Sequence, residues 1–398
     1  MSDRRVGLWL IGAFGGVGST TALGLAGLVR KLVPPTGMVT ALPAFAELPF
    51  DPPSAFVVGG HDIRQTSFAR AADELHSRSM VFAEPLLKAC EPELADWSRN
   101  VRPGVLFRPG HAIAALEDRP DVTHAATPAA AIEQIQSDLR AFKADHSLEQ
   151  VVVVNVASTE PPFELGASHA SLAALQAALG DAEPPALPTS SVYAYAALDA
   201  GFPYVNLTPS RGATMPALEE LARARGVPHA GQDAKTGETL LKSVLAPLFA
   251  KRNLRVLSWV GHNILGNRDG QVLADPSNKA SKVRSKDALL AELLGYKPQS
   301  LVSIEYVESL DDWKTAWDHI HFEGFLGTKM TLQFTWQGCD SVLAAPLVLD
   351  LARLVLLAQR RGEAGMLAEL ACFFKSPLGG GDHDFGKQVE RLEAYLTA

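Results

Sequence analysis

The stretch VGLWLIGAFGGVGST, which occupies Val6–Thr20, decides the fold of this chain. Its first part, Val6–Ile11, is an apolar run typical of a buried parallel strand. The turn that follows carries glycines at regular intervals, Gly12, Gly15 and Gly18. An apolar helix is predicted from there to about Val29. A glycine turn between strand and helix lets the backbone approach a pyrophosphate at the helix N-terminus, so the order predicts a dinucleotide site, although the spacing is G-x-x-G-x-x-G rather than G-x-G-x-x-G.

A second strand is predicted at Ala55–Asp62, and it ends in an acid. The proline-rich residues 32 to 55 before it are expected to form an irregular excursion. Asp62 is the candidate ligand for the ribose hydroxyls, and the excursion accounts for its lying beyond the usual offset of about 20 residues. An acid there favours NAD over NADP, because it would repel a 2′-phosphate. The alternative is that Asp62 caps a helix.

Further apolar runs predict more strands of a parallel sheet. Glu149–Val156 reads as a central strand, and Tyr204–Pro209 reads as another strand with a polar end. Open α/β sheets bind ligands at the carboxyl ends of their strands. Polar residues stand at that end of the first of these strands, namely Asn155, Ser158 and Thr159. A plain transition from strand to loop is the alternative.

The second half of the chain has a different pattern of apolar and polar residues. We predict a helix at Thr239–Arg252, strands at Leu301–Glu308 and Lys329–Gln337, and a long helix at Ser341–Arg361. The strand at 329–337 alternates apolar and polar side chains, which predicts one buried face and one polar face. Earlier in the chain, residues 64 to 146 show mostly helical patterns. A chain of 398 residues is too long for one core, so two domains are expected.

Composition excludes several classes of protein. Apolar residues make up 47% and charged residues 20%, as in ordinary soluble proteins, and the net charge of −8 argues against a nucleic-acid binder. The three cysteines are too widely spaced for a disulfide framework or a zinc motif, which fits a reducing cytoplasm. The apolar run near the N-terminus is broken by glycines and is a poor signal peptide. Asp350 and Arg353 indicate that the apolar helix at 341–361 is buried rather than membrane-spanning.

Lysines and carboxylates recur at separated points after the glycine loop. They occur in NKASKVRSK at 278–286, DDWK at 311–314, CDS at 339–341 and FFKSP at 373–377. Lysine is a compact charge with a shiftable pKa, and it suits proton transfer and the binding of an oxyanion or phosphate. A nucleotide fold followed by this set indicates carbonyl chemistry on an anionic sugar.

Taken one at a time, these motifs have ordinary alternatives. Lys282 and Lys286 would share one face of a helix, yet two lysines on a solvated face are the default. The loop GQDAKTGET at 231–239 could be a second anion cradle or a plain helix cap. Asp269, within GNRDG, reads by itself as part of a surface turn. The histidines show no metal-binding spacing.

Together the segments resemble the myo-inositol-1-phosphate synthase family, in its shorter prokaryotic form. The resemblance is carried by the glycine loop with Ser19-Thr20, Val58–Ile63, Gly231–Lys242, His262–Lys286, Asp312–Lys314, Gly338–Pro346 and Phe374-Lys375. It implies an α/β fold with a Rossmann-like NAD-binding domain and an inserted α+β catalytic and oligomerisation domain. The implied domains are residues 1–238, completed by 344–398, and residues 239–343.

The resemblance implies a redox-neutral cyclisation of D-glucose 6-phosphate to 1L-myo-inositol 1-phosphate. The steps are C5 oxidation by NAD, enolisation, intramolecular aldol closure and re-reduction. The implied catalytic residues are Lys282, Lys286, Lys314, Lys375, Asp233, Asp269, Asp312 and Asp340. The implied substrate-binding residues are Thr236, Gly237, Thr239 and Asn267. The implied cofactor-binding residues are Gly12, Gly15, Gly16, Val17, Gly18, Asp62, Asn155, Ser158, Thr159, Asp233 and Asp340.

The family pattern is not followed everywhere. The chain has Thr236-Gly237-Glu238-Thr239 where eukaryotic members have Ser-Gly-Gln-Thr, and Glu238 near a phosphate would be unfavourable unless it points away. The glycine loop has Phe14 and Gly16-Val17 where relatives often carry Gly and Asn-Asn. An NAD-dependent cyclase or dehydrogenase acting on a different sugar phosphate is therefore the alternative function. A catalytically silent nucleotide sensor is a third hypothesis, against which the full set of lysines and aspartates argues.

The remaining expectations concern partners. The resemblance implies a cytoplasmic homotetramer built through the inserted sheet, with the strand at 329–337 as a candidate for its outer face. A small sugar phosphate is the expected partner, without nucleic acid or membrane. The sequence leaves open whether a divalent or a monovalent cation is needed, and no metal ligands are assigned.

Overall fold

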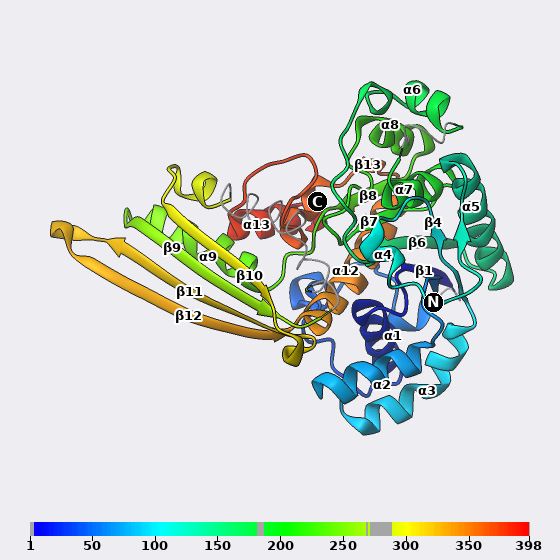
Figure 1. Cartoon of the computed structure of the whole chain (residues 1–398), viewed down its shortest axis with the longest axis horizontal. Coiled ribbons are helices and arrows are strands. Elements are labelled where there is room, and N and C mark those ends of the chain that lie inside the picture. Colours follow the sequence, from blue (N-terminus) through cyan, green and yellow to red (C-terminus); the bar gives the residue numbers. More distant parts are fainter. Residues whose placement is uncertain (1–3, 181–186, 268–269, 271–288, 398) are drawn as a thin grey trace.

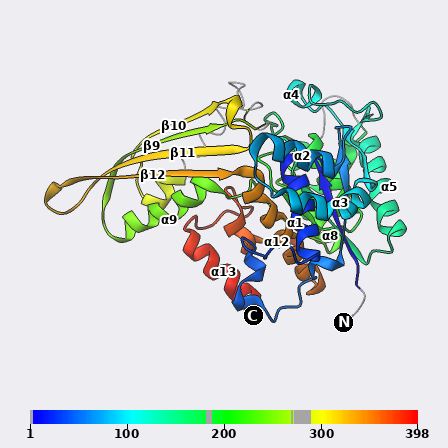
Figure 2. The same ribbon diagram turned by 90° about the horizontal axis from the view of Figure 1, so that it is seen from below.

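The structure is a computed structural model, and it describes residues 4–180, 187–267, 270 and 289–397. Two separate sheets dominate it (Figure 1). The larger one lies among helices, whereas the smaller one extends away from it as a long, curved blade (Figure 2). The chain is therefore α/β, with a Rossmann-like sheet and a second sheet beside it.

The larger sheet has the strand order β13-β8-β7-β6-β1-β2-β3, and its strand pairs are parallel. The strands are β1 (Val6–Ile11), β2 (Phe56–Asp62), β3 (Val101–Pro103), β6 (Gln150–Asn155), β7 (Tyr204–Asn206), β8 (Pro228–Gly231) and β13 (Gly365–Met366). The predicted strands at 6–11, 55–62, 149–156 and 204–209 are confirmed within a few residues. The chain order reverses at β1, between β2 and β6, so the switch point of the sheet lies at the glycine turn.

Helices pack in two groups around this sheet. One group holds α1 (Gly16–Val29), α2 (Phe68–Ser79), α3 (Glu84–Ser98) and α12 (Asp340–Arg360). The other holds α5 (Pro128–Asp145), α6 (Leu172–Ala178), α7 (Thr189–Asp199) and α8 (Pro216–Arg225). Residues 64–146 are mostly helical as predicted, with the short α4 (His111–Ala114) and the small β4–β5 pair (Val105–Leu106, Thr123–His124) between the helices.

The second sheet has the order β10-β9-β11-β12. Its strands are β9 (Arg255–Leu265), β10 (Gln299–Tyr306), β11 (Trp313–Glu323) and β12 (Lys329–Cys339). Helix α9 (Gly237–Lys251) packs on one face through a small core that includes Phe249, Trp259 and Ile320. The C-terminal helix α13 (Phe385–Thr397) packs against α9. The predicted strands at 301–308 and 329–337 and the helix at 239–252 are confirmed, whereas β9 and β11 were not predicted.

The apolar face of the strand at 329–337 is less buried than we predicted. Leu332, Phe334 and Trp336 alternate with polar residues as predicted, but they are only half-buried, and Met330 is exposed. The reason is that β12 is the edge strand of the sheet and runs out beyond α9 into a projecting hairpin (Figure 1).

Helix α12 is long and apolar enough to span a membrane by length and composition, and two thirds of that apolar window (67%) is buried inside the protein. It packs against α1 and β6, as expected for a core helix. Its Asp350, which is 0% exposed, accepts hydrogen bonds from Val39 N (2.7 Å), Thr40 N (2.9 Å) and Thr40 Oγ1 (2.6 Å). This carboxylate fixes the proline-rich excursion to the core.

We expect Asp350→Ala to lower the free energy of unfolding by about 3 kcal/mol, because several buried donors would lose their acceptor. Chemical unfolding followed by circular dichroism measures the loss. The control is Asp96→Ala, which removes an exposed carboxylate on α3 and should change little. Equal stability of the two variants would contradict the assigned role of Asp350.

Candidate active site

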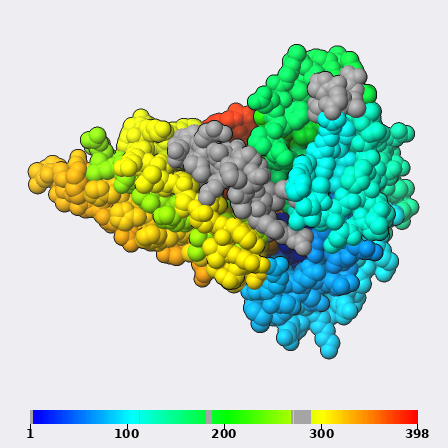
Figure 3. Space-filling view, viewed as in Figure 1, coloured from blue at the N-terminus to red at the C-terminus, as the bar shows by residue number. Residues whose placement is uncertain are grey.

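A cavity of about 780 Å³ lies at the carboxyl edge of the larger sheet, where the second sheet meets it. The space-filling view shows the part built around the second sheet, in yellow and orange, touching the blue N-terminal part below the centre of the molecule (Figure 3). The glycine loop, the ends of β2 and β6, the residues after β8, the turn before β11 and the start of α12 all contribute to its wall. Segments from the whole length of the chain thus share one cavity.

The glycine loop has the geometry of a pyrophosphate site. Gly12 has a φ of +84°, and a Cβ there would lie 2.8 Å from the Cα of Ala157. Helix α1 begins just after it, with Gly15 as N-cap and no acid in its first turn, so its positive end faces the cavity. The predicted residues Gly12, Gly15, Gly16 and Val17 line the cavity, whereas Gly18 is buried within α1. These residues fit a dinucleotide.

Asp62 lines the cavity and also shapes the loop. Its carboxylate accepts hydrogen bonds from the backbone of Phe14 (2.6 Å) and Arg64 (2.8 Å). Burial raises the pKa of this carboxyl, although these bonds oppose the rise. Helix α2 has Ser67 as its N-cap, so the alternative reading of Asp62 as a helix cap is wrong.

The end of β6 joins the wall through Asn155. Its amide donates to Asn206 Oδ1 (3.2 Å) and Thr208 Oγ1 (3.3 Å), which ties β6 to the residues after β7. The predicted Ser158 and Thr159 line the cavity with it. The end of β6 is therefore more than a plain transition from strand to loop, because buried hydrogen bonds between polar side chains join it to the residues after β7.

Glu160 is a cavity residue that the sequence analysis missed. Its Oε1 accepts a hydrogen bond from the backbone of Ser190 (2.9 Å) at the start of α7, and burial raises the pKa of the carboxyl. A carboxylate at a helix N-terminus stabilises that helix. The only signal in the sequence was its place directly after the polar residues at the end of β6.

Lys375 and Asp233 form one ion pair on the wall, with 2.9 Å between Nζ and Oδ1. Their backbones are paired as well, because Lys375 N donates to Asp233 O (2.7 Å) and Gln232 N donates to Ser376 O (3.0 Å). Asp233 itself has a φ of +63°. The loop after β8 and the chain after residue 373 therefore present this pair together.

Lys314 and Asp340 form a second pair, with 3.5 Å between Nζ and Oδ2. Lys314 stands at the start of β11 and Asp340 at the start of α12, and both line the cavity. Each is partly exposed, at 23%. Two lysine ammonium groups with acid partners thus face the cavity that holds the glycine loop.

Asp312 acts differently from the other predicted acids. Its carboxylate accepts hydrogen bonds from the Cys339 thiol (2.7 Å), Ser341 N (2.9 Å), Ser341 Oγ (3.0 Å) and Asn267 Nδ2 (3.4 Å). It is 5% exposed, and burial raises its pKa. A Cβ at Gly16 would meet Ser341 Oγ at 2.4 Å, so this cluster abuts the N-terminus of α1. Asp312 orients the cavity wall and shares no described ion pair with a lysine.

The predicted phosphate region surrounds the start of α9. Thr236 and Asn267 line the cavity, whereas Gly237 and Thr239 are buried behind them. Glu238 points away from the cavity, with its Oε1 2.5 Å from the Nζ of buried Lys242. The first turn of α9 can therefore face an anion despite this acid. The predicted Lys282, Lys286 and Asp269 lie outside the described residues.

The fold and the site define a Rossmann-type NAD-binding protein whose second sheet completes the cavity. A family model described as myo-inositol-1-phosphate synthase, an NAD-binding family, matches residues 6–397. The chain belongs to this family.

Curated relatives agree with that assignment. The chain is 34% identical to inositol-3-phosphate synthase 1 of Bacteroides thetaiotaomicron, over 97% of this chain and 91% of that protein. It is 32% identical to inositol-3-phosphate synthase 1 of Populus euphratica, over 80% of this chain but 63% of that protein. The chain thus spans less than two thirds of the plant relative.

Solved structures show the same fold. Inositol-3-phosphate synthase of Caenorhabditis elegans aligns over 99% of this chain and 85% of that one, with a TM-score of 0.88 and 26% identity. A myo-inositol-1-phosphate synthase-related protein of Thermotoga maritima aligns over 99% of both chains, with a TM-score of 0.80 and 23% identity. The second likeness concerns the fold alone.

We expect Asp62→Ala to weaken NAD binding about tenfold, since the loss of charge-assisted hydrogen bonds loosens the glycine loop and removes a ribose ligand. Isothermal titration calorimetry measures the affinity. Asp73→Ala, which removes an exposed acid from α2, is the matched control. Unchanged NAD affinity in Asp62→Ala would sink the ribose role.

Proposed function

We propose that this protein is an NAD-dependent isomerase that converts D-glucose 6-phosphate to 1L-myo-inositol 1-phosphate without net redox change. The observation that carries the proposal is that two lysine–aspartate pairs share one cavity with the dinucleotide loop. Membership of the family and the names of the curated relatives support the same reaction.

NAD bound along the glycine loop would supply reversible hydride transfer. Gly12, Gly15, Gly16 and Val17 would hold its pyrophosphate, and Asp62 its adenine ribose. Asn155, Ser158 and Thr159 would line the other half of the cofactor. The need for a divalent or a monovalent cation stays open, because no cluster of three metal-ligating side chains occurs in the described part of the chain.

The lysines would manage the charge that develops on carbonyl oxygens. An ammonium group can donate a hydrogen bond to an oxygen that becomes an oxyanion, and a carboxylate beside it fixes its direction. We place Lys375 at the C1 or C5 oxygen, with Asp233 orienting it. Lys314, oriented by Asp340, would act on the phosphate or the aldol oxygen.

The remaining catalytic roles fall to residues outside the described ranges. Lys282 would act at the C5 oxygen, and Lys286 would share the phosphate and the aldol oxygen with Lys314. Asp269 would help to orient this set. The proton balance requires such groups, because the C5 hydroxyl and C6 each lose a proton, while the C1 oxygen and then the C5 oxygen each gain one.

The substrate phosphate would sit at the start of α9. Thr236 stands at the N-cap, Gly237 and Thr239 shape the first turn, and Asn267 lines the same cavity as Thr236. A helix N-terminus favours a phosphate. Because Glu238 turns toward Lys242, the main reason to expect a different sugar phosphate is removed.

One assay tests the proposed reaction. The purified protein is incubated with glucose 6-phosphate and catalytic NAD, and inositol phosphate and absorbance at 340 nm are followed together. Inositol phosphate without accumulated NADH is the expected result. Accumulation of NADH would mean a dehydrogenase, and the absence of any reaction would point to another sugar phosphate.

We expect Lys375→Ala to lower kcat by about a hundredfold or more while NAD affinity stays the same, because a donor to a developing oxyanion is lost. Product formation and calorimetric NAD binding are measured on the same preparation. Lys297→Ala, at an exposed site on the second sheet's side, is the control. Loss of NAD binding in Lys375→Ala would move this residue out of the substrate region.

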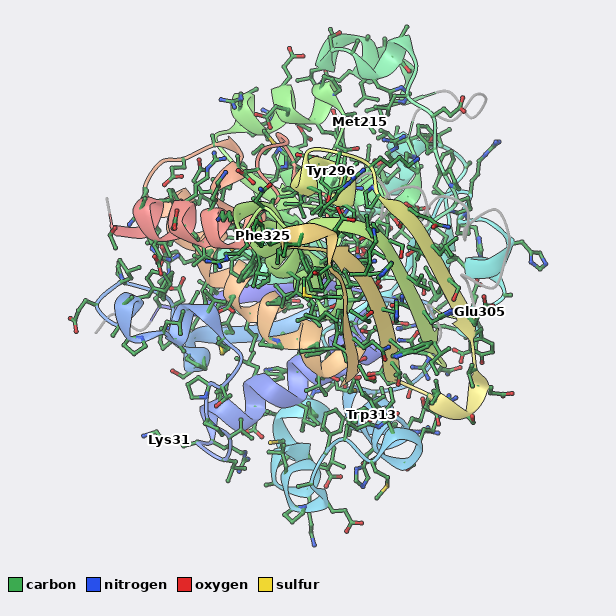
Figure 4. All side chains as sticks on the ribbon, turned by 90° about the vertical axis from the view of Figure 1, so that its left-hand side faces the viewer. Lys31, Met215, Tyr296, Glu305, Trp313 and Phe325 are labelled. Atoms are coloured by element: carbon green, nitrogen blue, oxygen red, sulfur yellow. The ribbon has the colours of Figure 1, made fainter. Side chains whose placement is uncertain are left out.

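The domain division and the assembly are also proposals. We take residues 1–238 and 344–398 as the NAD-binding domain and 239–343 as the catalytic and tetramerisation domain, in a cytoplasmic homotetramer. The face of the second sheet opposite α9 supports this, since Leu301 (54%) and Trp317 (47%) are exposed there. At the hairpin tip, which faces the viewer in Figure 4, Phe325 is 88% exposed.

We expect Trp317→Glu to convert the tetramer into smaller species, because a charge would be buried where two sheets meet. Light scattering coupled to size-exclusion chromatography measures the mass. Met80→Glu changes an exposed apolar residue at the end of α2 and should leave the mass unchanged. A tetramer that persists in Trp317→Glu would place the interface elsewhere.

A further inference from the structure

We propose that Arg78 and Ser79, at the end of α2, form a strap with Asp311, Asp312 and Trp313 that retains the nicotinamide cofactor in the cavity during turnover. The strap joins the nucleotide-binding part to the second sheet. Cofactor retention between the two hydride transfers rests on the proposed redox-neutral function, whereas the strap itself rests on the contacts below.

Three successive residues on one side bond to two successive residues on the other. The guanidinium of Arg78 lies 2.5 Å from Asp311 Oδ1, and its Nε donates to the same oxygen (2.6 Å). The backbone of Asp312 donates to Ser79 Oγ (3.2 Å), and Trp313 Nε1 donates to Ser79 O (2.7 Å). These partners are more than 230 residues apart in the chain, and Figure 4 shows Trp313 at the end of the second sheet that faces the nucleotide-binding part.

One part of the strap is shielded from water, and the other part is exposed to it. Ser79 and Asp312 are each 5% exposed, so their hydrogen bond is protected from water. Arg78 is 56% exposed, and its ion pair with Asp311 is weakened by solvent. A contact that is partly shielded and partly exposed can hold the cavity wall in place and still open. This property suits a contact that must release the cofactor.

The strap forms part of the cavity wall at the cofactor end. Arg78, Ser79, Asp311 and Asp312 all line the cavity. The Asp312 carboxylate also binds Ser341, which lies against the N-terminus of α1 where the pyrophosphate would sit. Opening the strap would therefore uncover the cofactor from the side of α2.

The backbone of Asp311 aims its carboxylate at Arg78. Asp311 has a φ of +48° and a ψ of −124°, a combination that residues other than glycine rarely adopt. The turn is fixed because Asp311 N donates to Glu308 O (3.2 Å) and Gly266 N donates to Asp311 O (3.1 Å). Because asparagine has nearly the same size and shape as aspartate, Asp311→Asn removes the charge with the smallest change to the turn.

A redox-neutral cyclase needs such retention. The reduced cofactor must stay bound from the oxidation of C5 until the ring ketone is reduced, since escape in between would strand an oxidised intermediate and release NADH. The fraction of turnovers that lose NADH depends on the ratio of the NADH dissociation rate to the rate at which the ring ketone is reduced. A strap that slows escape lowers this fraction without contacting the reacting atoms.

The first experiment measures NADH dissociation without substrate, by stopped-flow displacement with excess NAD. We expect Arg78→Gln and Asp311→Asn each to raise the dissociation rate about fivefold to tenfold, and the double variant to be no faster than either single one, because they break the same contact. Ser79→Ala should raise the rate as well. The control is Arg70→Gln, which removes an exposed arginine from the same helix and should leave the rate unchanged.

The second experiment counts NADH released per inositol phosphate formed. The strap variants should leak more NADH per product than the wild type or Arg70→Gln. Dissociation rates that match the wild type would overturn the strap even if the enzyme makes inositol phosphate. Faster dissociation in variants of a protein that makes no inositol phosphate would uphold the strap and overturn the proposed function instead.

Discussion

The buried carboxylate of Asp312 is the interaction on which the cavity depends. It binds the junction of β12 and α12 through Cys339 and Ser341, and it reaches Asn267 beyond β9. Its own backbone is bonded to α2. A carboxylate taken out of water must be matched by donors, and here those donors come from separate elements that would otherwise have no reason to meet. The desolvated charge therefore sets where the second sheet stops against the nucleotide-binding part.

The acids around the cavity divide into two kinds. Asp62, Glu160 and Asp312 are held by backbone and small polar groups, and burial raises the pKa of each. They give the wall its shape. Asp233 and Asp340 are more exposed and each pairs with a lysine, so they set where an ammonium group points. An electrostatically assisted carbonyl reaction needs a rigid cavity wall and ammonium groups that already point in the right direction. Donors that are placed in advance do not have to reorganise during the reaction.

The start of α9 shows how one substitution can be absorbed. A glutamate in the first turn of a phosphate-facing helix would repel the ligand if its side chain followed the helix axis. Glu238 instead lies in the interface with the second sheet, beside Lys242 and against Gly261, where a side chain would leave no room for it. The charge is compensated inside the protein, and the helix N-terminus keeps its attraction for an anion.

The sequence by itself determined the local structure. The strand, glycine turn and helix at 6–29 depend on neighbouring residues, and so do the apolar runs of β2 and β6. It also marked Lys314, Lys375, Asp233 and Asp340 as candidates through a resemblance. It did not show β9 and β11, whose faces are partly covered and mix polar with apolar residues, so their period is weak.

Only the tertiary structure decided which acid meets which lysine. Asp233 and Lys375 are 142 positions apart, and their pairing follows from the way two distant segments bond through their backbones. The same holds for Glu160 at α7 and for the strap between α2 and β11. The physical reason is that hydrogen bonds and ion pairs are made through space, so their partners are fixed by the packing of whole elements and leave no period or spacing in the chain.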